Sequence, residues 1–294
     1  MARRPLRRLA ALLIALALAA CGPGVVAPTT TEIRTTSTTT STTSTSTSVP
    51  TTTVPPTTVP ALEDIDAEVV VPEGEGSFPA VVLIHGGGWV TGDPGLMDPL
   101  ADHLNDNGFL TVNTRYELAD FDHPGYPTAV EDVACAVRYA AVHPDGDGTV
   151  TVIGHSAGAH IGALVALTGD DYVGDCPYPG TGIPERFVGL AGPYDVTRLG
   201  LAIAAFFGGG PDRIPEAWAA GNPQLLTDEN PDLRSLIMYG ELDGIVPESF
   251  ALDFHDALTT SGSDSALELI EGARHNEMHD PTLVGDLIVT WLHR

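Results

Sequence analysis

Residues 149–167, which read TVTVI GHSAG AHIGALVAL, decide the fold. The first five residues predict a buried strand, and the apolar run after Gly158 predicts a helix. Between them, the sequence Gly154-His155-Ser156-Ala157-Gly158 has the form G-x-S-x-G, a tight strand-to-helix turn that exposes the serine hydroxyl. Glycine is needed two residues before and two residues after Ser156, because a Cβ atom there would strike neighbouring backbone. Ser156 is therefore a candidate nucleophile.

Other apolar runs alternate with helical patterns along the chain. Strands are expected at residues 80–84, 110–114, 149–153, 187–190, 236–239 and 266–270, and helices at 129–141, 158–167, 250–259 and 281–293. This alternation predicts an α/β protein with a doubly wound, mostly parallel sheet flanked by helices. Sheets of this kind hold their functional sites at the carboxyl ends of the strands, where the motif around Ser156 also falls.

A second motif, His85-Gly86-Gly87-Gly88-Trp89, follows the strand run AVVLI. Successive glycines let the backbone approach a ligand and point its N–H groups at it. We expect the N–H groups of Gly87 and Gly88 to form an oxyanion hole together with that of Ala157. His85 is interpreted as a structural residue that braces this loop.

A serine hydroxyl needs a histidine base, and the histidine needs a carboxylate that orients it. His275 follows the last predicted strand and is favoured as the base, with His279 as the alternative. The remaining histidines are interpreted as surface or packing residues. Asp243 opens a turn after the strand run LIMY and is favoured as the carboxylate, with Glu241 as the alternative. Ser156, Asp243 and His275 then occur in the chain order of α/β hydrolases.

Taken together, these motifs resemble those of α/β-hydrolase esterases with an HGGGW-type oxyanion loop, the hormone-sensitive-lipase-like and bacterial feruloyl-esterase-like group. The resemblance runs from about residue 79 to the C-terminus. It implies a serine carboxylesterase that hydrolyses small acyl or aryl esters through an acyl-enzyme, without a cofactor. Kynurenine formamidases share the HGG-x-W loop, so the resemblance also admits an amide substrate. Few residues precede the first strand, so we expect no large N-terminal cap and a comparatively open pocket.

Two other functions remain open on sequence alone. A peptidase or amidase could use the same three residues, and a non-catalytic surface binding module could retain the fold without turnover. Residues 196–225 contain a helix-like apolar run at 199–207, which is expected either to border the pocket or to be an ordinary core helix. The formal net charge of −26 disfavours nucleic acid as a partner, and no spacing of His, Cys, Asp or Glu indicates a metal site.

The first sixty residues differ from the rest of the chain. Residues 1–21 combine four arginines, a short apolar run and Leu18-Ala19-Ala20-Cys21, which looks like the lipobox of bacterial lipoproteins. We expect Cys21 to be lipidated and to anchor an exported protein on the outer face of the cytoplasmic membrane; the alternative is an ordinary signal cleaved near Ala19. Residues 22–60 form a Thr/Ser/Pro-rich linker that cannot build a core, and residues 61–294 form the catalytic domain.

Two further cysteines, Cys135 and Cys176, lie in a predicted helix and in the loop after the next helix. An exported protein meets an oxidising compartment. With Cys21 acylated, these two remain as a natural pair, and we predict a disulfide between them.

Overall fold

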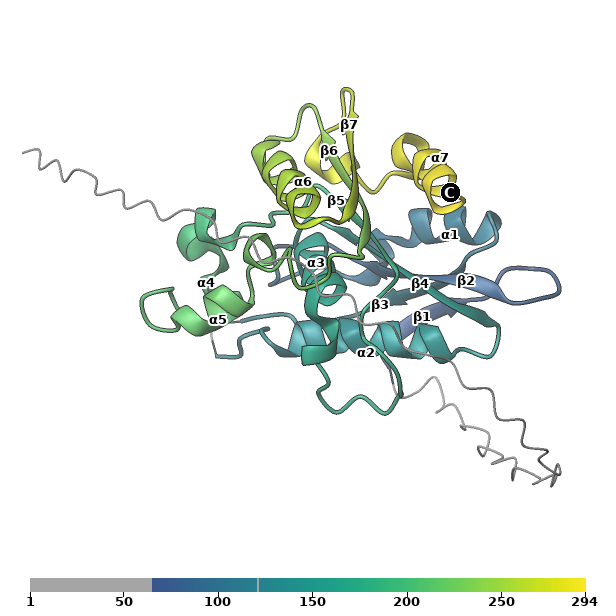
Figure 1. Ribbon diagram of the computed structural model, residues 1–294, viewed down its shortest axis with the longest axis horizontal. Coiled ribbons are helices and arrows are strands. Elements are labelled where there is room, and N and C mark those ends of the chain that lie inside the picture. Colours follow the sequence, from purple (N-terminus) through teal and green to yellow (C-terminus); the bar gives the residue numbers. More distant parts are fainter. Residues whose placement is uncertain (1–64, 121) are drawn as a thin grey trace, which may run out of the picture. The chain divides into compact units, whose positions relative to one another are not determined.

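A single sheet organises the part of the chain that the computed structural model describes, residues 65–120 and 122–294 (Figure 1). Its seven strands within this part lie in the order β1-β3-β2-β4-β5-β6-β7. They are β1 (Ala67–Val70), β2 (Phe78–Ile84), β3 (Leu110–Thr114), β4 (Gly146–His155), β5 (Arg186–Leu190), β6 (Arg234–Gly240) and β7 (Asp264–Ile270). Strand β1 pairs antiparallel with β3, and all other neighbours are parallel. The predicted mostly parallel sheet is confirmed.

Helices cover both faces of this sheet. They are α1 (Asp98–Asp106), α2 (Thr128–Val142), α3 (Ala157–Thr168), α4 (Ala204–Phe207), α5 (Pro215–Ala220), α6 (Ser249–Ser261) and α7 (Pro281–Leu292). One buried cluster joins α2, α3 and α6 to the sheet through Val133, Ala163 and Phe254. A second cluster joins α1 and α7 to the opposite face through Leu104 and Ile288, and Figure 1 shows these two helices side by side. Burial on both faces explains why the central strands are continuous apolar runs.

Strand register brings the functional loops to one edge. Ile84 at the end of β2 pairs with Gly154 near the end of β4, and His155 pairs with Leu190 at the end of β5. After β2 the chain continues to β3 on one side, whereas after β4 it continues to β5 on the other side. The loops that follow β2 and β4 therefore meet at the switch point of the sheet, where such folds bind ligands.

Several local features differ from the sequence expectation. Strand β1 and helices α1 and α5 were not predicted, because β1 is a four-residue edge strand, α1 begins in a polar, proline-containing stretch and α5 has only six residues. The helix-like run at 199–207 is broken: a 3₁₀ turn spans Gly200–Ile203, and α4 covers only Ala204–Phe207. Gly200 and Gly208 both have positive φ angles, 56° and 78°, which stop an α-helix at each end of the run.

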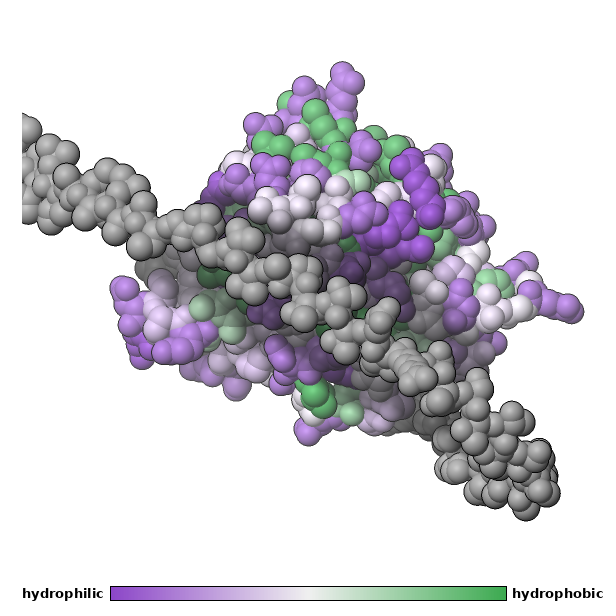
Figure 2. Space-filling model, in the orientation of Figure 1, coloured by the Kyte–Doolittle hydropathy of each residue, from purple (hydrophilic) through white to green (hydrophobic). Residues whose placement is uncertain are grey.

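Hydrophilic residues dominate the face drawn in Figure 2, with smaller hydrophobic groups between them, as the acidic composition leads one to expect. Among the helices of residues 65–294 other than 121, none is long and apolar enough to span a bilayer. The predicted signal segment, Cys21 and the Thr/Ser/Pro-rich linker lie outside the described residues.

Candidate active site

Ser156 occupies a strained turn between β4 and α3. Its φ angle is +54°, in the left-handed region that residues with a side chain rarely adopt, and its N–H group donates to the carbonyl of Leu190 over 2.8 Å. A Cβ atom on Gly154 would lie 2.3 Å from the carbonyl oxygen of Gly158, and one on Gly158 would lie 2.3 Å from that of Ile84. Only glycine fits at these two positions, so the G-x-S-x-G spacing is a direct requirement of packing.

Three side chains from distant parts of the chain form one line of hydrogen bonds. The Oγ of Ser156 lies 2.8 Å from Nε2 of His275, and Nδ1 of His275 lies 2.7 Å from Oδ2 of Asp243. The other carboxylate oxygen of Asp243 accepts the N–H groups of Ile245 and Val246 at 2.8 and 2.9 Å. The buried carboxylate is therefore fixed, and it holds the proton of His275 on Nδ1, which leaves Nε2 free to accept the serine proton.

The two alternatives weighed from the sequence occupy other places. The carboxylate of Glu241 is exposed and accepts the N–H of Gly272 at 2.9 Å. The ring of His279 packs against His155 at a centroid distance of 4.8 Å, and burial lowers its pKa. Neither side chain takes part in the hydrogen bonds that link Ser156, His275 and Asp243.

The glycine-rich loop after β2 lies directly against the serine turn. A Cβ atom on Gly86 would be 3.1 Å from the Cβ of Ser156, and one on Gly87 would be 1.8 Å from the carbonyl oxygen of Thr91. Gly87, Gly88 and Trp89 all have positive φ angles, of 131°, 60° and 65°. Glycine adopts such angles at little cost, which lets the backbone of this loop turn tightly next to Ser156.

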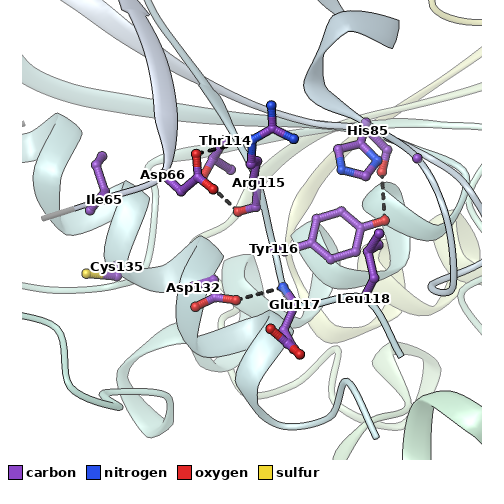
Figure 3. A pocket seen from close by; sticks show the side chains of 11 residues that line it. Ile65, Asp66, His85, Thr114, Arg115, Tyr116, Glu117, Leu118, Asp132 and Cys135 are labelled. Atoms are coloured by element: carbon purple, nitrogen blue, oxygen red, sulfur yellow. Dashed lines mark hydrogen bonds and ion pairs between the residues drawn. The ribbon is translucent and has the colours of Figure 1, made fainter. Parts of the chain in front are cut away.

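The ring of His85 contacts this loop, with its Nδ1 atom 2.7 Å from the carbonyl oxygen of Gly86. Its ring stacks on Tyr116 at 4.5 Å between centroids, and the Tyr116 hydroxyl donates to the carbonyl oxygen of His85 over 3.2 Å (Figure 3). Both rings line a cavity of about 370 Å³. Glu117 and Asp132 also line this cavity, whereas Ser156 does not. Burial, with the charges of Glu117 and neighbouring carboxylates, raises the pKa of Asp132 to about 6, although its carboxylate accepts the N–H of Glu117.

Residues 196–225 reach the site through Phe206, which also packs against His160 at a centroid distance of 5.7 Å, and through the carbonyl oxygen of Gly221, 2.9 Å from Nε2 of His160. Phe206 packs against Trp89 of the glycine-rich loop at a centroid distance of 5.8 Å. An apolar hollow of about 250 Å³ lies within this segment, between Pro211, Trp218 and Leu225. The segment therefore supports the glycine-rich loop from one side and has a hydrophobic hollow of its own.

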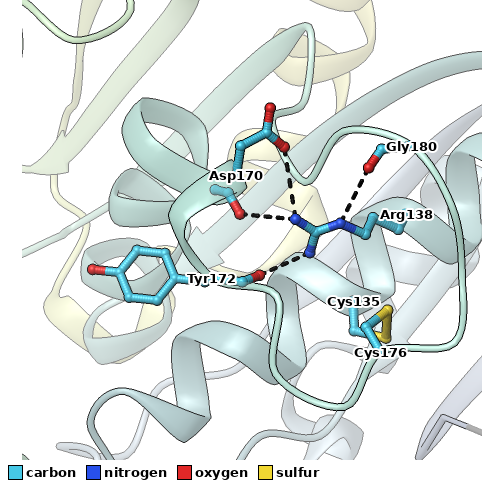
Figure 4. Close-up of a disulfide and its surroundings, with 7 residues drawn as sticks. Cys135, Arg138, Asp170, Tyr172, Cys176 and Gly180 are labelled. Carbon is cyan, nitrogen blue, oxygen red and sulfur yellow. Dashed lines mark hydrogen bonds and ion pairs between the residues drawn. A yellow bond between two sulfur atoms is a disulfide. The ribbon is translucent and has the colours of Figure 1, made fainter.

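Cys135 of α2 is joined to Cys176 by a disulfide, as predicted (Figure 4). The bond ties α2 to the loop after α3. Close to it, the guanidinium group of Arg138 donates to the carbonyl oxygens of Gly169, Tyr172 and Gly180 at 2.8 to 3.3 Å. This end of α3 is therefore fixed by a covalent bond and by a buried cation.

Two histidines that the sequence suggested only as packing residues also belong to this region. His155 and His160 are 5% and 0% exposed, and both hydrogen-bond to other parts of the site. The one signal in the sequence is a polar residue inside an otherwise apolar run on each side of Ser156. No group of three or more potential metal ligands gathers within residues 65–120 and 122–294.

The sheet, the strained serine turn and the hydrogen-bonded Ser-His-Asp set define an α/β-hydrolase fold. Residues 68–258 match the family model BD-FAE, and the chain belongs to that family. The matched range includes Ser156 and Asp243, whereas His275 lies beyond it.

Curated relatives and solved structures agree with this placement. The chain is similar to Esterase LipC and Esterase LipI of Mycobacterium tuberculosis, with 26% identity over 67% of this chain and 34% identity over 57%. It spans 55% and 58% of the lengths of these two relatives. A bifunctional GH43-CE protein of Bacteroides eggerthii has a similar fold, with a TM-score of 0.69 and 23% identity, over 79% of this chain and 34% of that one.

Proposed function

We propose that this protein is a serine carboxylesterase that hydrolyses small acyl or aryl esters through an acyl-enzyme. The observation that carries the proposal is the unbroken line of hydrogen bonds from Ser156 through His275 to Asp243. Its geometry is that of a nucleophile, a general base and an orienting carboxylate.

In the acylation step, Nε2 of His275 takes the proton of Ser156 while Oγ attacks the ester carbonyl carbon. Asp243 stabilises the imidazolium ion that forms, because its buried carboxylate already accepts the Nδ1 proton at 2.7 Å. The imidazolium then gives its proton to the departing alcohol or phenol, which leaves an ester on Ser156. Water attacks this acyl-enzyme in the second step, again with His275 as the base, and releases the acid.

The negative charge that develops on the carbonyl oxygen is assigned to the N–H groups of Gly87, Gly88 and Ala157. Ala157 opens helix α3, whose first N–H groups have no acceptor within the helix and whose dipole favours an anion. The glycine-rich loop approaches Ser156 closely enough to complete this cradle. The proposed reaction needs only these groups and water.

Ester hydrolysis is favoured over amide hydrolysis because LipC and LipI are both named esterases. A panel of p-nitrophenyl esters from acetate to longer acyl chains, with acetylated sugars, feruloyl esters, short acylglycerols, formyl amides and a peptide, tests the substrate class. Turnover of amides or peptides without turnover of any ester would replace the proposal with an amidase or peptidase.

The catalytic assignment is tested with Ser156→Ala on the best ester of that panel. Loss of the nucleophile is expected to lower kcat by about 10⁴-fold or more, since a triad acts as a unit. A fluorophosphonate probe should label the unchanged protein and leave Ser156→Ala unlabelled. Equal turnover by the two proteins would refute the nucleophile, and no turnover with no labelling would favour a non-catalytic binding module.

Matched controls come from the two alternatives of similar chemistry. His279→Phe and Glu241→Gln remove an imidazole and a carboxylate close to the site that lie outside the line of hydrogen bonds, and Phe keeps an aromatic ring against His155. Both variants should keep kcat within about threefold of the unchanged protein, because neither loss alters a reacting group.

We further propose that the protein is exported and anchored by a lipid on Cys21, at the outer face of the cytoplasmic membrane. The support is the Leu18-Ala19-Ala20-Cys21 sequence after a basic and apolar leader. In the native host, the Cys21→Ala variant should carry no lipid. It should either appear in the medium and not in the membrane fraction, or accumulate as an unprocessed precursor. Mass spectrometry of the N-terminal peptide should show a diacylglycerol on Cys21; an unmodified N-terminus near residue 20 would contradict the anchor.

A further inference from the structure

Two buried histidines flank the nucleophile, and the proposed mechanism uses neither. His155 immediately precedes Ser156, and His160 lies four residues after it on α3. Burial lowers the pKa of His155 to about 3 and that of His160 to about 4, so both rings are neutral at physiological pH. The titratable groups that face His155 are His275, His279 and Asp243.

His155 holds the loop that carries the proposed base. Its Nε2 lies 2.9 Å from the carbonyl oxygen of His275, and because a carbonyl can only accept, Nε2 must carry the proton. The same carbonyl receives the N–H of Met278 at 3.3 Å, a longer contact. On its other side, the His155 ring abuts the glycine-rich loop, since a Cβ atom on Gly86 would lie 2.8 Å from its Nδ1. The ring therefore contacts the loops of both the base and the oxyanion hole.

His160 holds the glycine-rich loop through Trp89. The indole N–H of Trp89 donates to Nδ1 of His160 over 3.2 Å, and Nε2 of His160 donates to the carbonyl oxygen of Gly221 over 2.9 Å. Both ring nitrogens are thus satisfied, and only one neutral tautomer permits this arrangement. Trp89 needs the support, because it has a φ angle of +65° directly after Gly88.

Packing alone does not account for these two side chains. An apolar side chain of similar size would fill each space without the cost of burying an imidazole. Each ring instead forms hydrogen bonds with segments far away in the sequence: residue 275 for His155, and residues 89 and 221 for His160. These segments are the loop that carries His275, the glycine-rich loop after β2 and the segment at residues 196–225.

We propose that His155 and His160 are positioning residues. His155 fixes the backbone of His275, and His160 fixes the glycine-rich loop through Trp89. This inference rests on the proposed function, since it assigns the two histidines to the same site. The His155 ring also packs against the ring of His275, at 5.0 Å between centroids. The hydrogen bonds of both histidines go to groups that hold the reacting residues, so each acts through another group.

The test for His155 compares His155→Gln, whose amide nitrogen can replace the Nε2 donor, with His155→Leu, which cannot donate. We expect His155→Leu to lower kcat about 10- to 100-fold with little change in KM, because a small displacement of the base is costly, and His155→Gln to recover most of the loss. The low-field proton resonance of the His275 Nδ1–H group, which reports the bond to Asp243, should weaken or vanish in His155→Leu and remain in His155→Gln.

The test for His160 compares three variants. His160→Asn retains an acceptor at the place of Nδ1, His160→Gln retains a donor at the place of Nε2, and His160→Leu retains neither. If His160 acts through Trp89, Asn should rescue kcat better than Gln, whereas a role in holding Gly221 predicts the reverse order and overturns the proposal. The low-field resonance of His275 should persist in all three variants. Trp89→Phe, which removes the indole donor but keeps an aromatic ring, should lower kcat as much as His160→Leu, with no further loss in the double variant.

All variants are compared below their unfolding midpoints, measured by circular dichroism. Equal kcat losses for the Leu and the conservative variant at either position, or a low-field resonance that His155→Leu leaves intact, would overturn the proposal. If the protein without substitutions hydrolyses no ester, the proposed function is refuted. The low-field resonance in the His155 variants would still decide whether His155 positions His275.

Discussion

The two ends of helix α3 differ in what they hold. At its N-terminus, the chain keeps Ser156 in a strained conformation beside the buried rings of His155 and His160 and the buried carboxylate of Asp243. At its C-terminus, the buried guanidinium group of Arg138 donates to three carbonyl oxygens and lies 3.6 Å from the carboxylate of Asp170, close to a disulfide (Figure 4). A positive charge at this end also complements the helix dipole.

This comparison teaches that one helix joins a reactive end to a stabilising end. Changes at the N-terminal end should alter the reaction rate and leave the free energy of unfolding nearly unchanged. Changes at the C-terminal end, and along the neighbouring helix α2, should do the opposite. The predictions below test that division, from the largest expected effect to the smallest.

Asp243→Asn should produce the largest change. The Asn oxygen can still accept the N–H groups of Ile245 and Val246, but its amide group would turn His275 into the wrong tautomer. We expect kcat/KM to fall by about 10⁴-fold, with a midpoint of thermal unfolding close to that of the unchanged protein. Ester hydrolysis and a melting curve measure the two quantities. A loss below tenfold would point to another carboxylate, with Glu241→Gln as the variant to compare.

Removal of the disulfide should have the next largest effect, on stability alone. The bond closes a loop with a sequence separation of 41 residues, for which the chain-entropy argument gives about 4 kcal/mol. The double variant Cys135→Ala/Cys176→Ala should lose up to that amount in urea unfolding and keep its kcat at a temperature where it is folded. A tenfold lower kcat in the folded double variant would show that the two ends of α3 are coupled.

Arg138→Met should cost about 3 kcal/mol, because it removes a buried cation that donates to three carbonyl oxygens and pairs with Asp170 at 3.6 Å, and it leaves the buried carbonyl oxygen of Tyr172 without this donor. Met keeps much of the apolar stem of the side chain, so the change isolates the guanidinium group. Arg198→Met, which breaks a more exposed ion pair with Asp253, is the control and should cost less than about 1 kcal/mol. Equal losses for the two variants would contradict the role assigned to Arg138.

Asp132→Asn should give the smallest effect, and a pH-dependent one. The pKa of Asp132 is raised to about 6 in the folded protein, so its ionisation costs stability as the pH rises from about 4 through 6. Asn removes that cost and can still accept the N–H of Glu117. The variant should be more stable than the unchanged protein by about 1 kcal/mol at pH 8, after allowance for solvent screening, and equal to it near pH 4. Urea unfolding at both pH values measures this, and a gain of the same size at pH 4 would exclude ionisation as the cause.

Much of the fold could be predicted because its signals are local. Buried parallel strands are short apolar runs, and G-x-S-x-G and HGGGW both encode tight backbone that only glycine permits, as the Cβ contacts at Gly154 and Gly158 show. The edge strand β1 escaped prediction because half-exposed residues give it a weak pattern. The break at Gly200 escaped because the following residues are good helix formers.

The parts of the site that could not be predicted depend on distant pairs. The partner of His155 is 120 residues away, and one partner of His160 is 61 residues away. A histidine inside an apolar run looks the same in sequence whether it packs or positions another group. Only the three-dimensional arrangement separates the two, since it is the fold that brings the carbonyl groups of His275 and Gly221 to these rings.

The antiparallel direction of β1 decides on which side of the sheet the chain enters the described domain. Because Ala67 pairs with Thr114 and the N–H of Arg115 donates to Asp66, the start of the described chain lies at the same edge of the sheet as Ser156. The polypeptide therefore enters the described domain on the side of the sheet that holds Ser156, and not on the opposite side, where the parallel strands begin.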